Sequence, residues 1–281
     1  MIDANGNKIK DGETVDVEFM REEINFFTKC ADKNGFNDSI ANKIAEMINI
    51  YLKEKMTSDF DDVIEKLEQY CPHSRSDDFL WELVYINRKM SDAIRDIPIR
   101  MIKYALRSAE KFEYICNIRP STHNKYCAVL EYLCAADVYK RIRPIDIEKT
   151  KEIYFAAERM LESIDDTESE KYIKSGISLY KSMLDFFKKV GSECGIDGYE
   201  YLLKLASVSM KKYELENEYI YLYDVADIYI KLLSYDRFDY YENKSEIDKL
   251  FKYRENHKDS FTIGSIMNKL RVAIDKKLSA I

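Results

Sequence analysis

Four cations in the middle of the chain have the spacing of one helical face. They are Arg100, Lys103, Arg107 and Lys111. Side chains three or four residues apart lie next to one another on a helix, so this set predicts a basic ridge that binds an acidic protein partner. Arg141 and Arg143 follow one helix later and would extend the ridge. The alternative is a solvated helix back that Glu110 and Glu113 neutralise.

Carboxylates and histidines are the candidates for metal chemistry. Asp61-Asp62-x-x-Glu65 resembles the aspartate-rich helix that binds magnesium diphosphate in all-α prenyl-transfer enzymes. The motif lies near an expected helix start, where acids complement the helix dipole. Cysteines near His73 and His123 lack the paired spacing of structural zinc sites. With no G-x-S-x-G, Walker or H-E-x-x-H motif either, the sequence predicts no metal, no cofactor, no catalytic residue and no enzyme.

The composition favours long helices as the elements that position these side chains. The chain has 281 residues, of which 46% are hydrophobic and 34% charged, and only eight are glycine and four proline. Sandwiches and barrels need a turn residue every 8–12 positions, which so few glycines and prolines cannot supply. No stretch is long and apolar enough to cross a membrane, and the polar N-terminus does not look like a signal peptide.

Prolines at positions 72, 98, 120 and 144 punctuate the first half of the chain. Proline is tolerated in the first helical turn and disfavoured in the interior, so these intervals predict helices of about 15–20 residues joined by short loops. In the second half, glycines between 191 and 198 mark a break. Residues 236–244 are expected to form a loop before helices at about 245–256 and 261–279.

Uniform helices on short connectors must lie antiparallel to their neighbours. Most of them carry one or two apolar stripes and a charged back, which favours a stack of helical hairpins over a closed bundle. We therefore expect about a dozen helices in an all-α, tetratricopeptide-like, right-handed superhelix. Residues 17–281 would form one repeat domain with a sub-boundary near 191–198, after an N-terminal arm or hairpin at 1–16.

Tyrosine is abundant and unevenly placed: 14 of the 22 tyrosines follow residue 153. Tyr219, Tyr221 and Tyr223 alternate as in a strand, whereas Leu222 and Val225 continue a helical pattern that the context favours. Tyrosines at the rim of a groove would suit partner recognition. The alternative explanation for the high number of tyrosines is a codon bias of low-GC genomes.

Charge and cysteine content bear on partners and compartment. The net charge is −7, which makes nucleic acid an unlikely partner, but residues 95–151 and 249–281 are each locally basic. Such patches suggest an acidic protein or, at most peripherally, an anionic membrane surface. The six cysteines form no C-x-x-C pair, which predicts reduced thiols and a cytoplasmic location.

One stretch resembles a known family. Ala135-Ala136-Asp137-Val138-Tyr139, then Ile145-Asp146-Ile147-Glu148-Lys149 and Ala156-Ala157-Glu158, are similar to middle repeats of the soluble NSF attachment proteins, the SNAP family. The tryptophan expected at the start of that family's last helix is missing, and so is a clear apolar membrane loop. The resemblance implies an adaptor in membrane-fusion complex disassembly, with a basic terminal helix toward an ATPase. The residues implied there are Lys269, Arg271, Lys276 and Lys277.

The sequence therefore predicts a non-enzymatic helical-repeat adaptor that binds an acidic or helical protein. Two alternatives belong to other classes: an all-α enzyme or regulator with an internal ligand pocket, and a helical nucleic-acid-binding protein. A buried pocket lined by acids or histidines would favour the enzyme, whereas a shallow groove with solvated charges would favour the adaptor.

Overall fold

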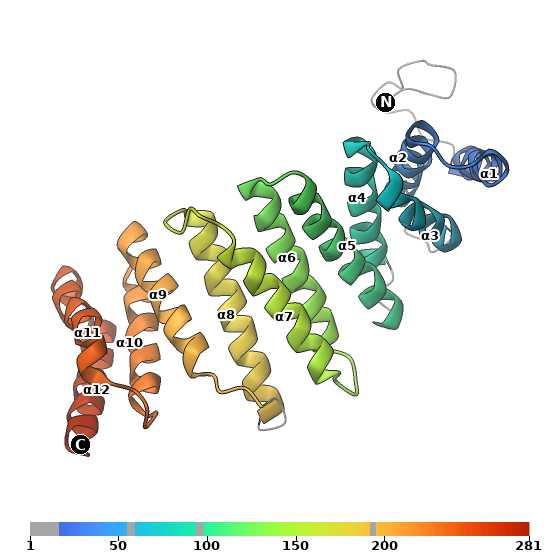
Figure 1. Cartoon of the computed structure of the whole chain (residues 1–281). Helices are drawn as coiled ribbons and strands as arrows, with labels where there is room; N and C mark the ends of the chain where they lie inside the picture. The colour runs from blue at the N-terminus through green and yellow to red at the C-terminus, as the bar shows by residue number, and fades with distance from the viewer. Residues whose placement is uncertain (1–16, 55–59, 94–97, 192–194, 281) are drawn as a thin grey trace. The chain divides into compact units, whose positions relative to one another are not determined.

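A computed structural model describes residues 17–54, 60–93, 98–191 and 195–280 (Figure 1). In this part the chain forms twelve α-helices and no strand, which confirms the all-α class and the predicted number of helices. The expected arm at 1–16 lies outside the described residues. The chain divides into two compact units, unit 1 from Met1 to Arg119 and unit 2 from Pro120 to Ile281. The single repeat domain and the right-handed superhelix stay predictions.

Unit 1 is built from five helices and a short 3-10 turn. They are α1 (Val17–Asn34), α2 (Asp38–Glu54), α3 (Asp61–Tyr70), the turn η1 (Cys71–His73), α4 (Asp77–Ala93) and α5 (Pro98–Ile118). Helix α2 packs against α1 and α4, and α4 packs against α5. Ile44, Ile48 and Leu83 are completely buried between them, so the stripes that the sequence shows on these helices are core faces.

Asp38, the first residue of α2, ties the chain after α3 back onto that helix. Its Oδ1 accepts hydrogen bonds from Ser74 Oγ at 2.7 Å and Tyr70 Oη at 2.9 Å, and its Oδ2 accepts from the Arg75 amide at 3.2 Å. The Ser74 bond is the strongest influence and lowers the pKa of Asp38. Burial opposes it, and the bonds from Tyr70 and Arg75 lower the pKa further.

Replacing this carboxylate should flatten the acid limb of the stability profile of unit 1. The folded pKa lies below the unfolded value, which is about 3.9. The stabilisation is therefore present above the unfolded pKa and is lost as the pH falls through the folded one. We expect the native chain to lose stability more steeply than Asp38→Asn below about pH 4.

Urea unfolding followed through Trp81, the only tryptophan of the chain, measures this in unit 1. Asp62→Asn removes an exposed carboxylate from α3 and is the control for the loss of a single carboxylate. Identical slopes for the native chain and Asp38→Asn would contradict the assignment.

Unit 2 contains the other seven helices. They are α6 (Thr122–Tyr139), α7 (Ile147–Glu162), α8 (Glu170–Val190), α9 (Tyr199–Glu216), α10 (Tyr219–Leu233), α11 (Tyr240–Arg254) and α12 (Phe261–Leu278), with the 3-10 turn η3 (Glu255–His257) before α12. Successive helices pack in pairs, as in a stack. In addition α6 packs on α8, and α10 on α12. Helices α8 and α10 do not form such a pair. In the described residues each of them packs on α9, and neither packs closely on the other.

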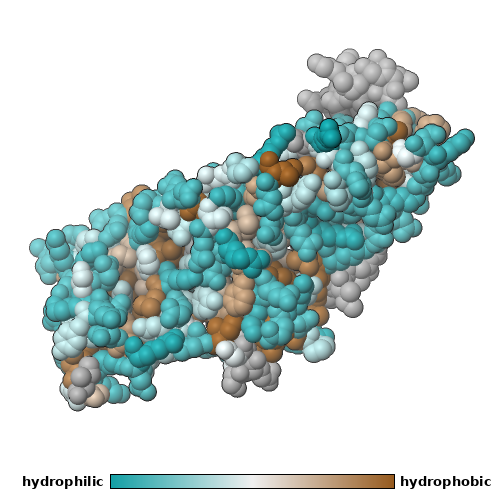
Figure 2. Space-filling view, viewed as in Figure 1, coloured by the Kyte–Doolittle hydropathy of each residue, from teal (hydrophilic) through white to brown (hydrophobic). Residues whose placement is uncertain are grey.

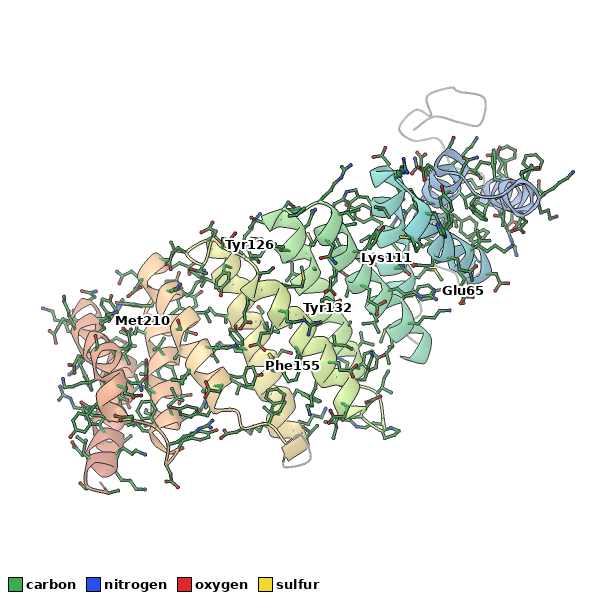
Figure 3. All side chains as sticks on the ribbon, in the orientation of Figure 1. Glu65, Lys111, Tyr126, Tyr132, Phe155 and Met210 are labelled. Carbon is green, nitrogen blue, oxygen red and sulfur yellow. The ribbon has the colours of Figure 1, made fainter. Side chains whose placement is uncertain are left out.

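Many of the abundant tyrosines serve the core of unit 2. Figure 3 marks Tyr126 and Tyr132 on α6, both nearly buried. Buried hydroxyls join helices: Tyr126 Oη lies 2.6 Å from Ser169 Oγ, and Tyr154 Oη lies 2.8 Å from Ser182 Oγ. Burial raises the pKa of Tyr229 to about 12, so its hydroxyl stays protonated. The alternating tyrosines after residue 218 belong to helix α10, which confirms the helical interpretation.

The loop predicted at 236–244 is wrong in its second half. Helix α11 begins at Tyr240, because Asp239 caps it: Oδ1 accepts from the amides of Tyr241 at 2.7 Å and Glu242 at 3.2 Å. An N-cap side chain supplies acceptors that the first turn of a helix lacks, and a glutamate three residues later is part of the same signature. Asp239-x-x-Glu242 carried this signal in the sequence.

The cysteines in the described residues carry free thiols, as predicted. They are Cys30, Cys71, Cys116, Cys127 and Cys134, and Cys194 lies outside the described residues. Among the helices described, none has the length and apolar character needed to cross a membrane.

Candidate functional site

The basic ridge of α5 faces another helix of unit 1. Lys103 pairs with Glu65 of α3, and Arg107 Nη2 lies 3.9 Å from the same carboxylate. Lys111 Nζ lies 2.6 Å from Glu68 Oε2, one turn further along α3. Figure 3 shows Glu65 and Lys111 on these neighbouring helices. Glu65 and Glu68 of α3 thus meet the ridge within unit 1, a contact that neither sequence pattern revealed.

The Lys111–Glu68 pair is the least exposed part of this contact. The two side chains keep 20% and 10% of their exposure. Glu68 Oε1 also accepts from Asn87 Nδ2 of α4 at 2.6 Å, so three helices meet at one carboxylate. Burial lowers the pKa of Lys111, but Glu68 raises it more, and the net pKa is raised. The ridge therefore holds α3 against α5 and α4.

Other predicted partner-binding cations are divided between internal contacts and solvent. Arg143 Nη1 donates to the carbonyls of Lys140 and Ile142, and Lys277 Nζ donates to those of Tyr235 and Asp236. The Arg271 guanidinium lies 5.2 Å from the Phe251 ring centre. Arg141, Lys269 and Lys276 are exposed, and no side-chain partner for them occurs in the described part of the chain. The Arg100 side chain lies outside the described residues.

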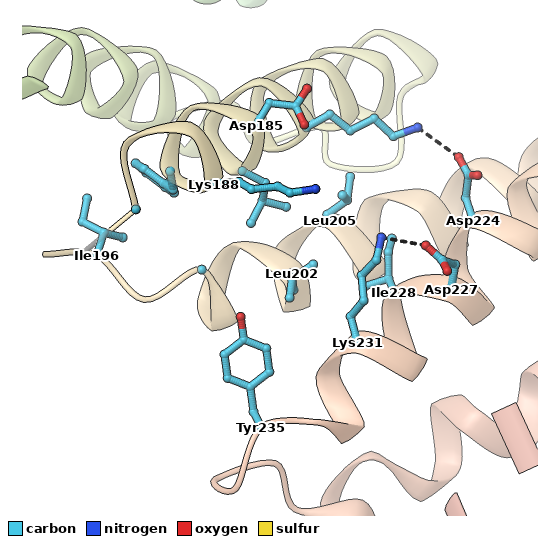
Figure 4. Close-up of a pocket in the computed structure, with 15 residues that line it drawn as sticks. Asp185, Lys188, Ile196, Leu202, Leu205, Asp224, Asp227, Ile228, Lys231 and Tyr235 are labelled. Atoms are coloured by element: carbon cyan, nitrogen blue, oxygen red, sulfur yellow. Dashed lines mark hydrogen bonds and ion pairs between the residues drawn. The ribbon is translucent and has the colours of Figure 1, made fainter. Parts of the chain in front are cut away.

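A cleft of about 790 Å³ opens in unit 2 between α8 and α10 (Figure 4). Helix α9 forms its floor with Leu202 and Leu205, and Leu184, Phe187 and Ile228 add apolar surface from the walls. We call this cleft the α8–α10 groove. It exists because the two wall helices pack on α9 and leave the space above it unfilled.

The rims of the α8–α10 groove carry equal numbers of positive and negative charges. They are Lys181, Asp185 and Lys188 from α8, and Asp224, Asp227 and Lys231 from α10. Lys181 Nζ lies 2.9 Å from Asp224 Oδ2 and joins the two walls, and Lys231 Nζ lies 2.7 Å from Asp227 Oδ2 (Figure 4). Within the described residues, Asp185 and Lys188 have no ionic partner, so they are available to a ligand.

The shifted titratable groups are held in their ordinary charge states. A hydrogen bond from Lys103 lowers the pKa of Glu65, and burial raises the pKa of Tyr180. Burial alone would lower the pKa of Lys204, but hydrogen bonds to Glu158 and Glu162 raise it overall. A catalytic acid or base needs a pKa moved toward neutrality, and these shifts go the other way. In the described part of the chain no group of three or more His, Cys, Asp or Glu side chains could hold a metal ion.

The sequence held a signal for the α8–α10 groove in the spacing of the residues that line it. Groove residues on α8 recur at 181, 184, 185, 187 and 188, and those on α10 at 224, 227, 228 and 231. Both sets follow helical spacing, but each mixes charged and apolar side chains. Figure 2 shows that one face of the molecule carries both kinds of side chain: separate apolar patches lie among hydrophilic side chains.

Comparisons with known proteins show no family to which the chain belongs. No protein-family model and no curated protein matches it. Among solved structures the chain is similar to a computationally designed, self-assembling cyclic protein homooligomer, with 14% sequence identity over 94% of this chain and 95% of that chain. The TM-score of 0.18 is too low for this similarity to support an argument about fold or function.

Proposed function

We propose that this chain is a non-enzymatic helical adaptor that holds a segment of a partner protein in the α8–α10 groove. The observation that carries the proposal is an open cleft with an apolar floor and charged rims. Amphipathic helices bind other proteins by laying an apolar face into such a groove.

The groove chemistry describes the segment it would accept. Leu202 and Leu205, which are 8% and 5% exposed, offer a small contact area for aliphatic side chains on the inner face of the guest. Lys188 calls for a carboxylate and Asp185 for a cation, because both lie on one wall without an internal partner in the described residues. A guest helix with aliphatic anchors and charges of both signs on its edges satisfies all four residues.

The SNAP-like form of this proposal adds a source for the partner. The resemblance of residues 135–158 suggests a helical protein of a membrane-fusion complex in the cytoplasm. The exposure of Lys269 and Lys276 on α12 supports a second contact there, with an ATPase. The ridge cations of α5 are a weaker choice for the acidic partner, because Glu65 and Glu68 already neutralise them.

Site-specific photo-crosslinking tests where the partner binds. A photoreactive phenylalanine analogue placed at Lys188 should capture a protein from native lysate, and the same analogue at the exposed Arg159 of α7 should not. The crosslinked segment, identified by mass spectrometry and then synthesised, should bind the purified chain. Leu184→Arg fills the groove with a charge and should weaken binding at least about tenfold, as the loss of a central apolar contact does.

Leu215→Arg is the matched control, because Leu215 is 53% exposed on α9 and does not line the groove. Binding that is equally strong in Leu184→Arg would show that the groove is not the docking site. A small molecule found on the native chain by native mass spectrometry, and missing from Leu184→Arg, would instead assign the groove to a ligand-binding regulator.

A further inference from the structure

Helix α1 uses only one of its faces inside unit 1. Ile24, Thr28 and Ala31 are buried, and this face packs on α2. The Thr28 hydroxyl donates to the Ile24 carbonyl at 2.7 Å, so even the polar member of this face is satisfied. In the described residues the opposite face packs on no helix as closely as this face packs on α2.

That opposite face carries an aromatic stripe. Phe26 is 61% exposed and Phe19, seven residues earlier, is 49% exposed. Cys30, four residues after Phe26, is half-buried on the same side. Residues at these spacings share one side of a helix, so the stripe runs along most of α1. An aromatic ring so exposed at the centre of a helix contributes little to the fold of the chain itself.

Charged residues flank the stripe in a fixed order along the helix. Glu22 and Glu23 lie in its first half, and Lys29 and Lys33 lie in its second half. In the described part of the chain none of these four side chains has an ionic partner. This order also complements the helix dipole, but the dipole does not account for the aromatic stripe between the charges.

We propose that α1 is a self-association helix, which pairs antiparallel with α1 of a second copy of the chain. A two-fold axis near Phe26 would stack the two Phe26 rings and bring Glu22 opposite Lys29 and Lys33 of the second copy, because these three residues lie on one flank of the stripe. A two-fold interface needs a patch that is complementary to itself, and this order of charges provides one. Parallel pairing would instead set acids against acids and lysines against lysines.

The size of the helix determines the strength of this contact. An 18-residue helix is about 27 Å long and offers less than the roughly 800 Å² per partner of a standard interface. We therefore expect a reversible dimer that forms at micromolar concentrations and weakens with salt, because exposed charges contribute to it. This association is independent of the α8–α10 groove, which lies in unit 2.

Sedimentation velocity of the full chain between about 1 and 100 μM at low salt tests the proposal over the expected micromolar range. The native chain should shift from monomer to dimer, and Phe26→Ser should stay monomeric. Phe261→Ser is the matched control, since Phe261 is 89% exposed on α12 and should leave the dimer intact. A native chain that is monomeric at the highest concentration, or a Phe26→Ser variant that dimerises equally, overturns the proposal.

Charge reversal gives a second test that does not depend on the aromatic ring. Glu22→Lys with Glu23→Lys, and Lys29→Glu with Lys33→Glu, should each weaken self-association, while a mixture of the two variants should restore it. Oxidation of the native chain reports the orientation, because Cys30 lies four residues from the axis and its two copies are far apart in an antiparallel pair. The absence of a Cys30-to-Cys30 link supports antiparallel pairing, and its formation would show parallel pairing and overturn the proposal. Circular dichroism checks that each variant keeps its helices.

Discussion

Lys111→Met should destabilise unit 1 by about 2–4 kcal/mol, because it leaves the nearly buried Glu68 carboxylate without its cation. Asn87 still donates to Glu68, so part of the stabilisation remains. Urea unfolding followed through Trp81 fluorescence measures the change, since the Trp81 ring packs edge to face on Phe112 of α5 at 5.5 Å. The native chain and the variant are compared at the same pH and salt.

Lys66→Met supplies the control within unit 1. Lys66 Nζ lies 2.5 Å from Asp32 Oδ2, but both side chains are about 40% exposed, and such surface pairs contribute about 0–1 kcal/mol. The urea midpoint of Lys111→Met could stay as close to the native midpoint as that of Lys66→Met. That result would show that the ridge does not hold α3. The basic ridge would then be free for the partner-binding role that the sequence suggests.

Phe186→Ala should destabilise unit 2 by about 3–5 kcal/mol, the usual loss when a fully buried aromatic ring leaves a cavity. Phe186 is 1% exposed, and its ring centre lies 5.6 Å from that of Tyr154 and 5.8 Å from that of Phe187. Phe187 lines the α8–α10 groove, so the cavity should also loosen the α8 wall and weaken peptide binding there.

Chemical denaturation followed by far-UV circular dichroism measures the stability of this variant. Phe261→Ala makes the same substitution at a ring that is 89% exposed and should change stability by less than about 0.5 kcal/mol. Equal midpoints for the two variants would mean that the packing of α8 on α7 around Phe186 is not as described.

The two candidate surfaces differ in what already occupies them. On α5 the cations meet an acidic helix of the same unit, so a partner would have to compete with Glu65 and Glu68. In the α8–α10 groove the floor is apolar, and Asp185 and Lys188 have no ionic partner in the described residues. Charged side chains without an internal partner are the ones that a ligand can pair with, which is why we propose the groove rather than the α5 ridge as the docking site.

Local chemistry along the chain was sufficient to predict the helices. Pro98 opens α5 as expected. A two-residue connector that contains Asn217 separates α9 from α10. In α10 the alternating tyrosines were compatible with either a strand or a helix. Even the error at 236–244 was local, since Asp239 and Glu242 carried the cap signal. These features depend on residues within one or two helical turns, and backbone hydrogen bonds and caps act over that range.

The choice of partner for each helical face was decided only in the tertiary structure. Lys103 and Glu65 are 38 residues apart, and nothing in either local pattern says that the basic face of α5 meets the acidic face of α3. Nor do the mixed stripes of α8 and α10 reveal that these helices stand apart over α9 and leave a groove. A stripe shows that a face is amphipathic, but many faces of one chain satisfy the same hydrophobic and charge rules. Side-chain packing and pairing between distant segments select among them, and that selection is a property of the whole folded unit.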